Sequence, residues 1–68
     1  MDNFNNRLRN LRLEKELTQK QVAEAIGLTR NAIVNYESGI REPSIETIIL
    51  LCKYFDVSAD YLIGLSDY

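Results

Sequence analysis

The stretch TQKQVAEAIGLTRNAIVNYESG, residues 18–39, decides the fold, because it encodes two short helices joined by a very short turn. Thr18 is a favourable N-cap residue, and Gln21 three residues later completes a capping box. Gly27 follows the apolar end of the first helix, where glycine accepts a left-handed conformation at little cost. Thr29 then caps the second helix. Two helices separated by three residues cannot lie side by side, so we expect them to cross steeply, as in a helix-turn-helix.

Three further helices are predicted around this motif, and no long segment alternates as a strand does. Phe4, Leu8 and Leu11 recur at helical spacing near the N-terminus. Ser44 and Ser58 are each placed to cap a helix in the second half of the chain. The expected helices span residues 5–16, 19–26, 30–37, 45–55 and 59–63. The sequence therefore predicts an all-α fold of five helices, with one domain over the whole chain, residues 1–68.

Helical spacing also predicts which side chains face the core. In the helix expected over residues 45–55, the inward face is predicted to hold Ile45, Ile48, Leu51, Cys52 and Phe55. In the helix expected over residues 5–16, the residues predicted to face water are Arg7, Arg9, Asn10, Glu14 and Lys15. Cys52 is the only cysteine, and we expect it to be a small core residue.

The composition limits the classes of function. The chain has no histidine and one cysteine, so it lacks the commonest general base and metal ligand and cannot form an internal disulfide. It also lacks a Gly-rich phosphate loop, so no catalytic constellation can be assembled. No apolar run approaches the roughly 20 residues that span a membrane, and the polar N-terminus is unlike a signal peptide. We therefore expect a cytoplasmic protein that is not an enzyme and holds no metal or cofactor.

The net charge of −2 argues against indiscriminate binding to nucleic acid. The charge is unevenly distributed, because residues 1–41 carry +2 and residues 42–68 carry −4. An acidic far side would turn a basic face, which includes the helix-turn-helix, towards a phosphate backbone. Ordinary solvated surface charge is the alternative, and charge alone does not separate the two interpretations.

Several apolar and small residues stand where a DNA-binding helix-turn-helix requires them. They are Val22, Ala23, Ile26, Gly27, Leu28, Ile33 and Tyr36. The flanking pattern comprises Arg7-Leu8, Leu11-Arg12, Leu17-Thr18-Gln19, Tyr36-Glu37-Ser38-Gly39, Pro43-Ser44 and Asp56-Val57-Ser58. From about Asn5 to Gly64, the chain resembles the Cro/CI-type family of phage repressors and related bacterial regulators, which includes regulators of the xenobiotic-response-element type. The resemblance implies a compact fold like that of lambda repressor.

The resemblance also implies a function. It leads us to expect a transcriptional regulator, most simply a repressor, that binds double-stranded DNA as a homodimer at the bacterial nucleoid. No small-molecule ligand is expected in this domain. The alternative is a protein-interaction module of the same fold, such as an antitoxin or a coactivator-like protein. Such a module would be expected to expose more apolar side chains on the outer face of residues 29–35 than Val34 alone.

By resemblance, the second helix of the motif enters the major groove. The side chains implied to read bases are Thr29, Arg30, Asn31, Val34 and Asn35. Their chemistry suits the task, because arginine can donate two hydrogen bonds to guanine and asparagine can form two with adenine. The alternative is a polar helix face that serves only solubility.

The family also implies contacts to the phosphate backbone. The residues at those positions are Gln19, Lys20, Ser38 and Arg41. Gln19 is further expected to brace Arg30, whereas simple solvation is an alternative for Lys20. Two residues depart from the family pattern, because Ile40 takes a position that is often basic and Glu42 would repel phosphate. These departures predict weaker non-specific affinity.

Arg12 and Glu37 stand at positions that commonly pair in this family. The resemblance therefore implies a structural ion pair that fixes the angle of the first helix against the reading helix. A contact from Arg12 to phosphate is the alternative.

The C-terminal end has more apolar residues than one short amphipathic helix must bury. Part of this surface is a candidate dimer contact, made by Tyr61, Ile63, Leu65 and Tyr68. The alternative is that Tyr61 and Leu62 close the core of one copy.

Overall fold

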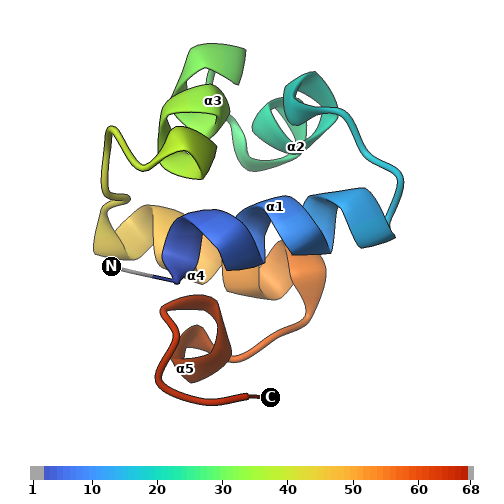
Figure 1. Ribbon diagram of the computed structural model, residues 1–68. Coiled ribbons are helices and arrows are strands. Elements are labelled where there is room, and N and C mark those ends of the chain that lie inside the picture. Colours follow the sequence, from blue (N-terminus) through green and yellow to red (C-terminus); the bar gives the residue numbers. More distant parts are fainter. Residues whose placement is uncertain (1–2, 68) are drawn as a thin grey trace.

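The computed structural model describes residues 3–67, which form five helices and no strand (Figure 1). The helices are α1 (Phe4–Glu14), α2 (Gln19–Ile26), α3 (Arg30–Ser38), α4 (Ile45–Phe55) and α5 (Ala59–Leu62). In Figure 1, α2 and α3 lie above α1 and α4, and α5 lies below them. The predicted all-α fold of five helices is confirmed for this part of the chain. None of these helices is long and apolar enough to cross a membrane.

The helix-turn-helix follows the predicted local chemistry. The Thr18 hydroxyl accepts a hydrogen bond from the Gln21 amide at 3.0 Å, and the Gln21 side chain accepts one from the Thr18 amide at 2.8 Å. This capping box begins α2, and Gly27 ends it in the left-handed region with a φ of 76°. The Thr29 hydroxyl then caps α3 by accepting from the Ala32 amide at 3.2 Å. The short turn leaves α2 and α3 packed directly against each other.

One fully buried side chain from each helix meets in a single core. These side chains are Leu8, Val22, Ile33, Leu51 and Leu62. The rings of Phe4 and Tyr36 join α1 to α3, with their centroids 6.0 Å apart in an edge-to-face arrangement. The burial of Leu62 shows that α5, although only 4 residues long, closes the core of one copy.

The inward face of α4 differs from the prediction at its first residue. The sequence predicts that Ile45 faces the core, but the residue is 74% exposed. Thr47 is buried on this face instead, and its hydroxyl is satisfied there by a hydrogen bond from the Ser44 hydroxyl at 3.1 Å. Cys52 is half-buried and packs against the core, and this burial raises the pKa of its thiol.

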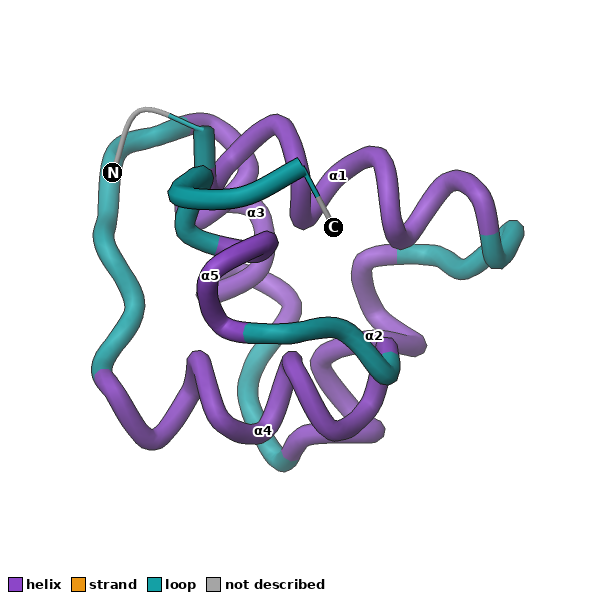
Figure 2. Tube along the Cα trace, turned by 90° about the horizontal axis from the view of Figure 1, so that it is seen from below, coloured by secondary structure: helices purple, strands orange, loops and turns teal. Residues whose placement is uncertain are grey.

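The prediction for Arg7 is wrong, because its side chain does not simply face water. Only 18% of the side chain is exposed, and its guanidinium donates hydrogen bonds to the carbonyl oxygens of Tyr61 and Ser66. The cause lies far along the chain, since the segment after α5 turns back over the first turns of α1 (Figure 2). Helical spacing within α1 carries no information about this return.

α1 ends at Glu14, two residues before the expected boundary, because the chain reverses at Glu16. Glu16 has a φ of 56°, in the left-handed region that favours glycine. The Leu17 amide donates to the Arg12 carbonyl at 3.0 Å, and the Glu16 amide donates to the Leu13 carbonyl at 3.0 Å. These two bonds are those of a Schellman motif, in which glycine is the usual residue at the position of Glu16.

Replacing Glu16 with glycine is therefore expected to stabilise the protein. The change removes the strain of a side chain in the left-handed region and should raise the free energy of unfolding by about 1 kcal/mol. Urea unfolding followed by circular dichroism measures the difference. The matched control is Glu24→Gly, at an exposed position inside α2, which should lower the free energy of unfolding by about 1 kcal/mol. Loss of stability in both variants would contradict the assignment of strain to Glu16.

Candidate nucleic-acid interface

The exposed face of α3 brings together the side chains predicted to read bases. Thr29, Arg30 and Asn31 are exposed, and Val34 and Asn35 are half-buried one turn later. Ile33 and Tyr36 point the opposite way, into the core. This division follows from helical periodicity, which places residues three or four apart on the same face. Between Thr29 and Asn35 the helix therefore presents a mainly polar surface to solvent.

An open depression of about 690 Å³ lies beside the first turn of α3. Its lining residues are Arg12, Leu13, Glu16, Leu17, Thr18, Gln19, Lys20 and Arg30. It therefore joins the start of α2 to the start of α3, and the amide groups at the N-terminus of α2 add a partial positive charge. Lys20 and Arg30 make this depression basic, whereas Glu16 contributes a negative charge at its rim.

A second depression, of about 280 Å³, lies between α1 and α3. It is lined by Arg9, Arg12, Gln19, Val34, Glu37 and Ser38. Arg9 is predicted from the sequence only to face water, and it makes no ion pair with any residue from 3 to 67. The sequence could have indicated this position, because Arg9 and Arg12 are three residues apart and residues three apart share a helix face.

Arg12 and Glu37 form an ion pair between α1 and α3. The Arg12 Nε lies 2.7 Å from one carboxylate oxygen of Glu37, and its Nη2 lies 3.0 Å from the other. The third nitrogen of the guanidinium donates to the Leu17 carbonyl at 2.9 Å. The two side chains are only 13% and 5% exposed, and the hydrogen bond to Glu37 raises the pKa of Arg12. Arg12 is therefore always charged and is directed at Glu37.

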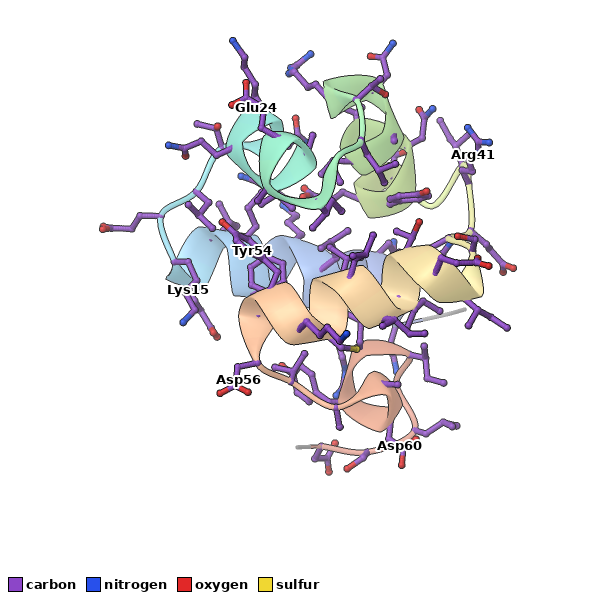
Figure 3. All side chains as sticks on the ribbon, turned by 180° about the vertical axis from the view of Figure 1, so that it is seen from behind. Lys15, Glu24, Arg41, Tyr54, Asp56 and Asp60 are labelled. Carbon is purple, nitrogen blue, oxygen red and sulfur yellow. The ribbon has the colours of Figure 1, made fainter. Side chains whose placement is uncertain are left out.

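The four residues expected to bind phosphate have different surroundings. The side-chain amide of Gln19 donates to the Glu37 carboxylate at 3.4 Å, and Gln19 and Arg30 both line the first depression. Lys20 lies 3.9 Å from Glu24 in an exposed pair. Two further groups lie at the end of α3. The Ser38 hydroxyl donates to the Asn35 carbonyl at 3.1 Å, and Arg41 is exposed beside α3 (Figure 3).

The three candidate dimer residues that the structure describes do not form one exposed patch. Tyr61 and Ile63 are half-buried and pack against the core, and the Arg7 guanidinium lies over the Tyr61 ring. Leu65 is 76% exposed. Tyr68 lies outside the described residues.

Comparison with known proteins places this geometry in a family. Residues 8–62 match the helix-turn-helix family. The uncharacterized HTH-type transcriptional regulator YobD of Bacillus subtilis is 39% identical over 61 residues, which are 90% of this chain and 54% of YobD. The cryptic phage CTXphi transcriptional repressor RstR of Vibrio cholerae is 36% identical over 64 residues, which are 94% of this chain and 58% of RstR. This chain thus spans little more than half the length of these relatives.

The fold is shared with a repressor that has been crystallised on DNA. The structure of the P22 c2 repressor in complex with a synthetic operator superimposes with a TM-score of 0.83 and 29% identity, over 87% of this chain and 89% of that one. The match to residues 8–62 includes the complete helix-turn-helix and most of the core. The chain therefore belongs to the Cro/CI-type helix-turn-helix family.

Proposed function

We propose that this chain binds double-stranded DNA at specific sequences and regulates transcription, most simply as a repressor that occludes a promoter. The observation that carries the proposal is the exposed start of α3, where Arg30 and Asn31 project beyond the buried Ile33. An α-helix fits the major groove, and the N-terminal residues of such a helix reach the base edges. The likeness to the P22 c2 repressor on its operator supports the same docking. Such a regulator would act at the nucleoid, in the cytoplasm.

The two depressions beside α3 supply candidate contacts to the phosphate backbone. Lys20 lines the first and Arg9 lines the second, while Gln19 lines both. Arginine, lysine, amide side chains and helix N-termini are the usual phosphate donors. We assign phosphate binding to Gln19, Lys20, Ser38 and Arg41, and we add Arg9. Ser38 can donate to phosphate once its hydroxyl turns away from the backbone of α3.

The size of the domain bears on how two copies would share one operator. Half-sites on a two-fold axis are about 34 Å apart, whereas the extents of the domain are 27 × 23 × 20 Å. Because that spacing exceeds the longest extent of the domain, two copies on one side of the duplex would touch only through parts that project towards the two-fold axis, and their contact would be small. We propose a homodimer in which Leu65 makes part of that contact, because its apolar side chain is exposed at the end of the domain.

The polar character of the α3 face favours DNA over a protein partner. Between Thr29 and Asn35, Val34 is the apolar side chain that reaches the outer surface, and it is half-buried. Protein interfaces are usually enriched at their centre in aromatic and apolar side chains. The alternative of a protein-interaction module therefore finds little support on this face.

Arg30→Ala is expected to remove the preference for one base pair of the operator while leaving the fold intact. A bidentate contact discriminates against the wrong base by about 1–3 kcal/mol, and an exposed arginine contributes little to the core. Selection of bound sites from a random duplex library first defines the operator. Binding to every single-base variant then measures discrimination, for the original protein and for Arg30→Ala and Asn31→Ala.

The matched control is Arg41→Ala, which removes an exposed arginine that we assign to phosphate. This variant should bind every sequence more weakly, and the slope of log affinity against log salt should fall by about 0.9. An unchanged preference at every position in Arg30→Ala would remove Arg30 from base reading. A library without any enriched site, from a folded protein, would redirect the proposal to a protein partner.

A further inference from the structure

We infer that Arg7 is a positioning residue for the pairing of two copies of this chain. The inference rests on the proposed dimer and adds a structural reason why two copies would associate. Arg7 lies on α1, far along the chain from Leu65, and it is outside both depressions of the proposed DNA interface. Its guanidinium holds the segment after α5, residues 63–67, which we call the tail. The tail carries the exposed side chain of Leu65.

The guanidinium of Arg7 makes four contacts with the C-terminal part of the chain. Its Nη1 donates to the Tyr61 carbonyl at 2.9 Å and also to the Ser66 carbonyl. Its central carbon lies 4.4 Å from the centroid of the Tyr61 ring, within the range of a cation–π interaction. Its Nη2 lies 3.6 Å from the carboxylate of Asp67, which is 96% exposed. One nitrogen therefore joins the last turn of α5 to the end of the tail.

The tail has further contacts, because Ile63 packs against the core and the backbone amides of the tail donate to nearby carbonyl oxygens. The amides of Leu65 and Ser66 both donate to the Asp60 carbonyl, at 2.8 and 3.2 Å. Gly64 has a φ of 89°, and a Cβ added there would lie 2.7 Å from the Cβ of Asn3. The tail thus passes very close to the start of α1 (Figure 2). The Arg7 guanidinium contacts the tail from that helix.

An ordered tail matters because the proposed contact between copies is small. Each side chain or loop that must be ordered on association reduces the affinity. Arg7 fixes the backbone on both sides of Leu65, at Tyr61 and at Ser66, before a second copy arrives. The exposed leucine is thereby presented in one arrangement, and the entropy of ordering it is already lost when the domain folds.

The test compares three variants that disturb the tail to different degrees. Arg7→Ala removes all four contacts of the guanidinium, and Arg7→Lys keeps the charge but loses the planar fork. Asp67→Asn removes only the exposed ion pair and is the matched control. Gly64→Ala displaces the tail from Asn3 without changing Arg7, so it tests the same idea independently.

Three quantities are measured for each variant. Sedimentation equilibrium gives the dissociation constant of the dimer, and hydrogen exchange gives the protection of the Leu65 and Ser66 amides. Binding to a duplex with a single half-site measures the DNA affinity of one copy of the protein in the absence of a second copy. Circular dichroism shows that each variant is folded.

We expect Arg7→Ala to weaken self-association by about tenfold or more, because hydrogen bonds from a charged donor are lost on both sides of Leu65. Protection of the two tail amides should fall in the same variant, while binding to the half-site stays within about twofold because no DNA contact is changed. Gly64→Ala should behave in the same way, and Arg7→Lys should recover part of the loss. Asp67→Asn should change each quantity by less than about twofold.

Two results would overturn the inference in distinguishable ways. Loss of tail protection with unchanged self-association, in Arg7→Ala or in Gly64→Ala, would show that the ordered tail does not assist pairing. A protein that stays monomeric in solution and on two-fold duplexes would overturn the dimer itself. Base preference measured on the single half-site does not depend on a dimer. It would therefore still test whether α3 binds specific bases, and failure of that proposal would be distinguishable from failure of the dimer.

Discussion

Arg12→Ala is expected to lower the free energy of unfolding by about 3–5 kcal/mol, the usual cost of removing one partner of a buried ion pair. Glu37 is 5% exposed, so its carboxylate would remain buried without the guanidinium that accompanies it. The Leu17 carbonyl, at the turn between α1 and α2, would lose its donor as well. Since a domain of 68 residues has a stability of a few kcal/mol, the variant should be largely unfolded at 25 °C. Circular dichroism and urea unfolding measure this directly.

The double variant Arg12→Met with Glu37→Leu separates two contributions to the free energy of unfolding. One is the cost of leaving the Glu37 carboxylate buried without its partner, and the other is the net stabilisation from the intact ion pair. Because both charges are removed together, most of the stability should return. Arg30→Ala is the matched control for removal of an exposed arginine, and it should change stability by less than about 0.5 kcal/mol. A loss below about 1 kcal/mol in Arg12→Ala would mean that the Glu37 carboxylate reaches water when its partner is gone.

The same double variant decides whether Arg12 also contacts phosphate. If the ion pair is its whole role, the salt dependence of DNA binding should be unchanged when both residues are replaced. A slope that falls by about 0.9 would instead assign one phosphate contact to Arg12. The raised pKa of Arg12 has a simple consequence for pH. The contribution that comes from protonation of Arg12 itself is fully present below its usual pKa and is lost as the pH rises through the raised value.

The features that could be predicted from the sequence are those fixed by neighbours in the chain. The Thr18 capping box, the Gly27 turn and the Thr29 cap each depend on residues within three or four positions. The same is true of the exposed face of α3, because a helix capped at Thr29 with Ile33 buried must turn Arg30 and Asn31 outwards. Local chemistry thus defines both the motif and the exposed surface of α3 that we propose reads bases.

The features that could not be predicted depend on contacts between distant segments. Arg7 is drawn into the structure by a tail that follows it by more than fifty residues, and no periodicity in α1 reveals this. Ile45 is exposed because α4 turns Thr47 inwards, which depends on how the core is filled. Arg9 becomes a candidate phosphate ligand only when α1 and α3 are seen to share a depression.

Ile33→Ala is expected to lower the free energy of unfolding by about 2–5 kcal/mol, the range for truncating a fully buried aliphatic side chain. Ile33 has no exposed surface and belongs to α3, which packs against both α1 and α2. Its loss leaves a cavity directly behind the exposed face of α3 that carries Arg30 and Asn31. Operator affinity should fall with the fraction of folded protein, because the folded form alone presents that face. Urea unfolding and operator binding on the same samples measure the two effects.

Two further variants show whether the cavity explains the Ile33→Ala result. Ile33→Val removes one methylene and should cost about 0.5–1.5 kcal/mol, whereas Ile40→Ala, at a position 79% exposed, should change stability by less than about 0.5 kcal/mol. Operator DNA at 100 times its dissociation constant should restore about 2.7 kcal/mol to the truncated protein, because it binds the folded form. If stability recovers but base preference does not, the cavity has also shifted α3 from its position in the original protein. Equal losses in Ile33→Ala and Ile40→Ala would contradict the role of Ile33 as the buried anchor of the reading helix.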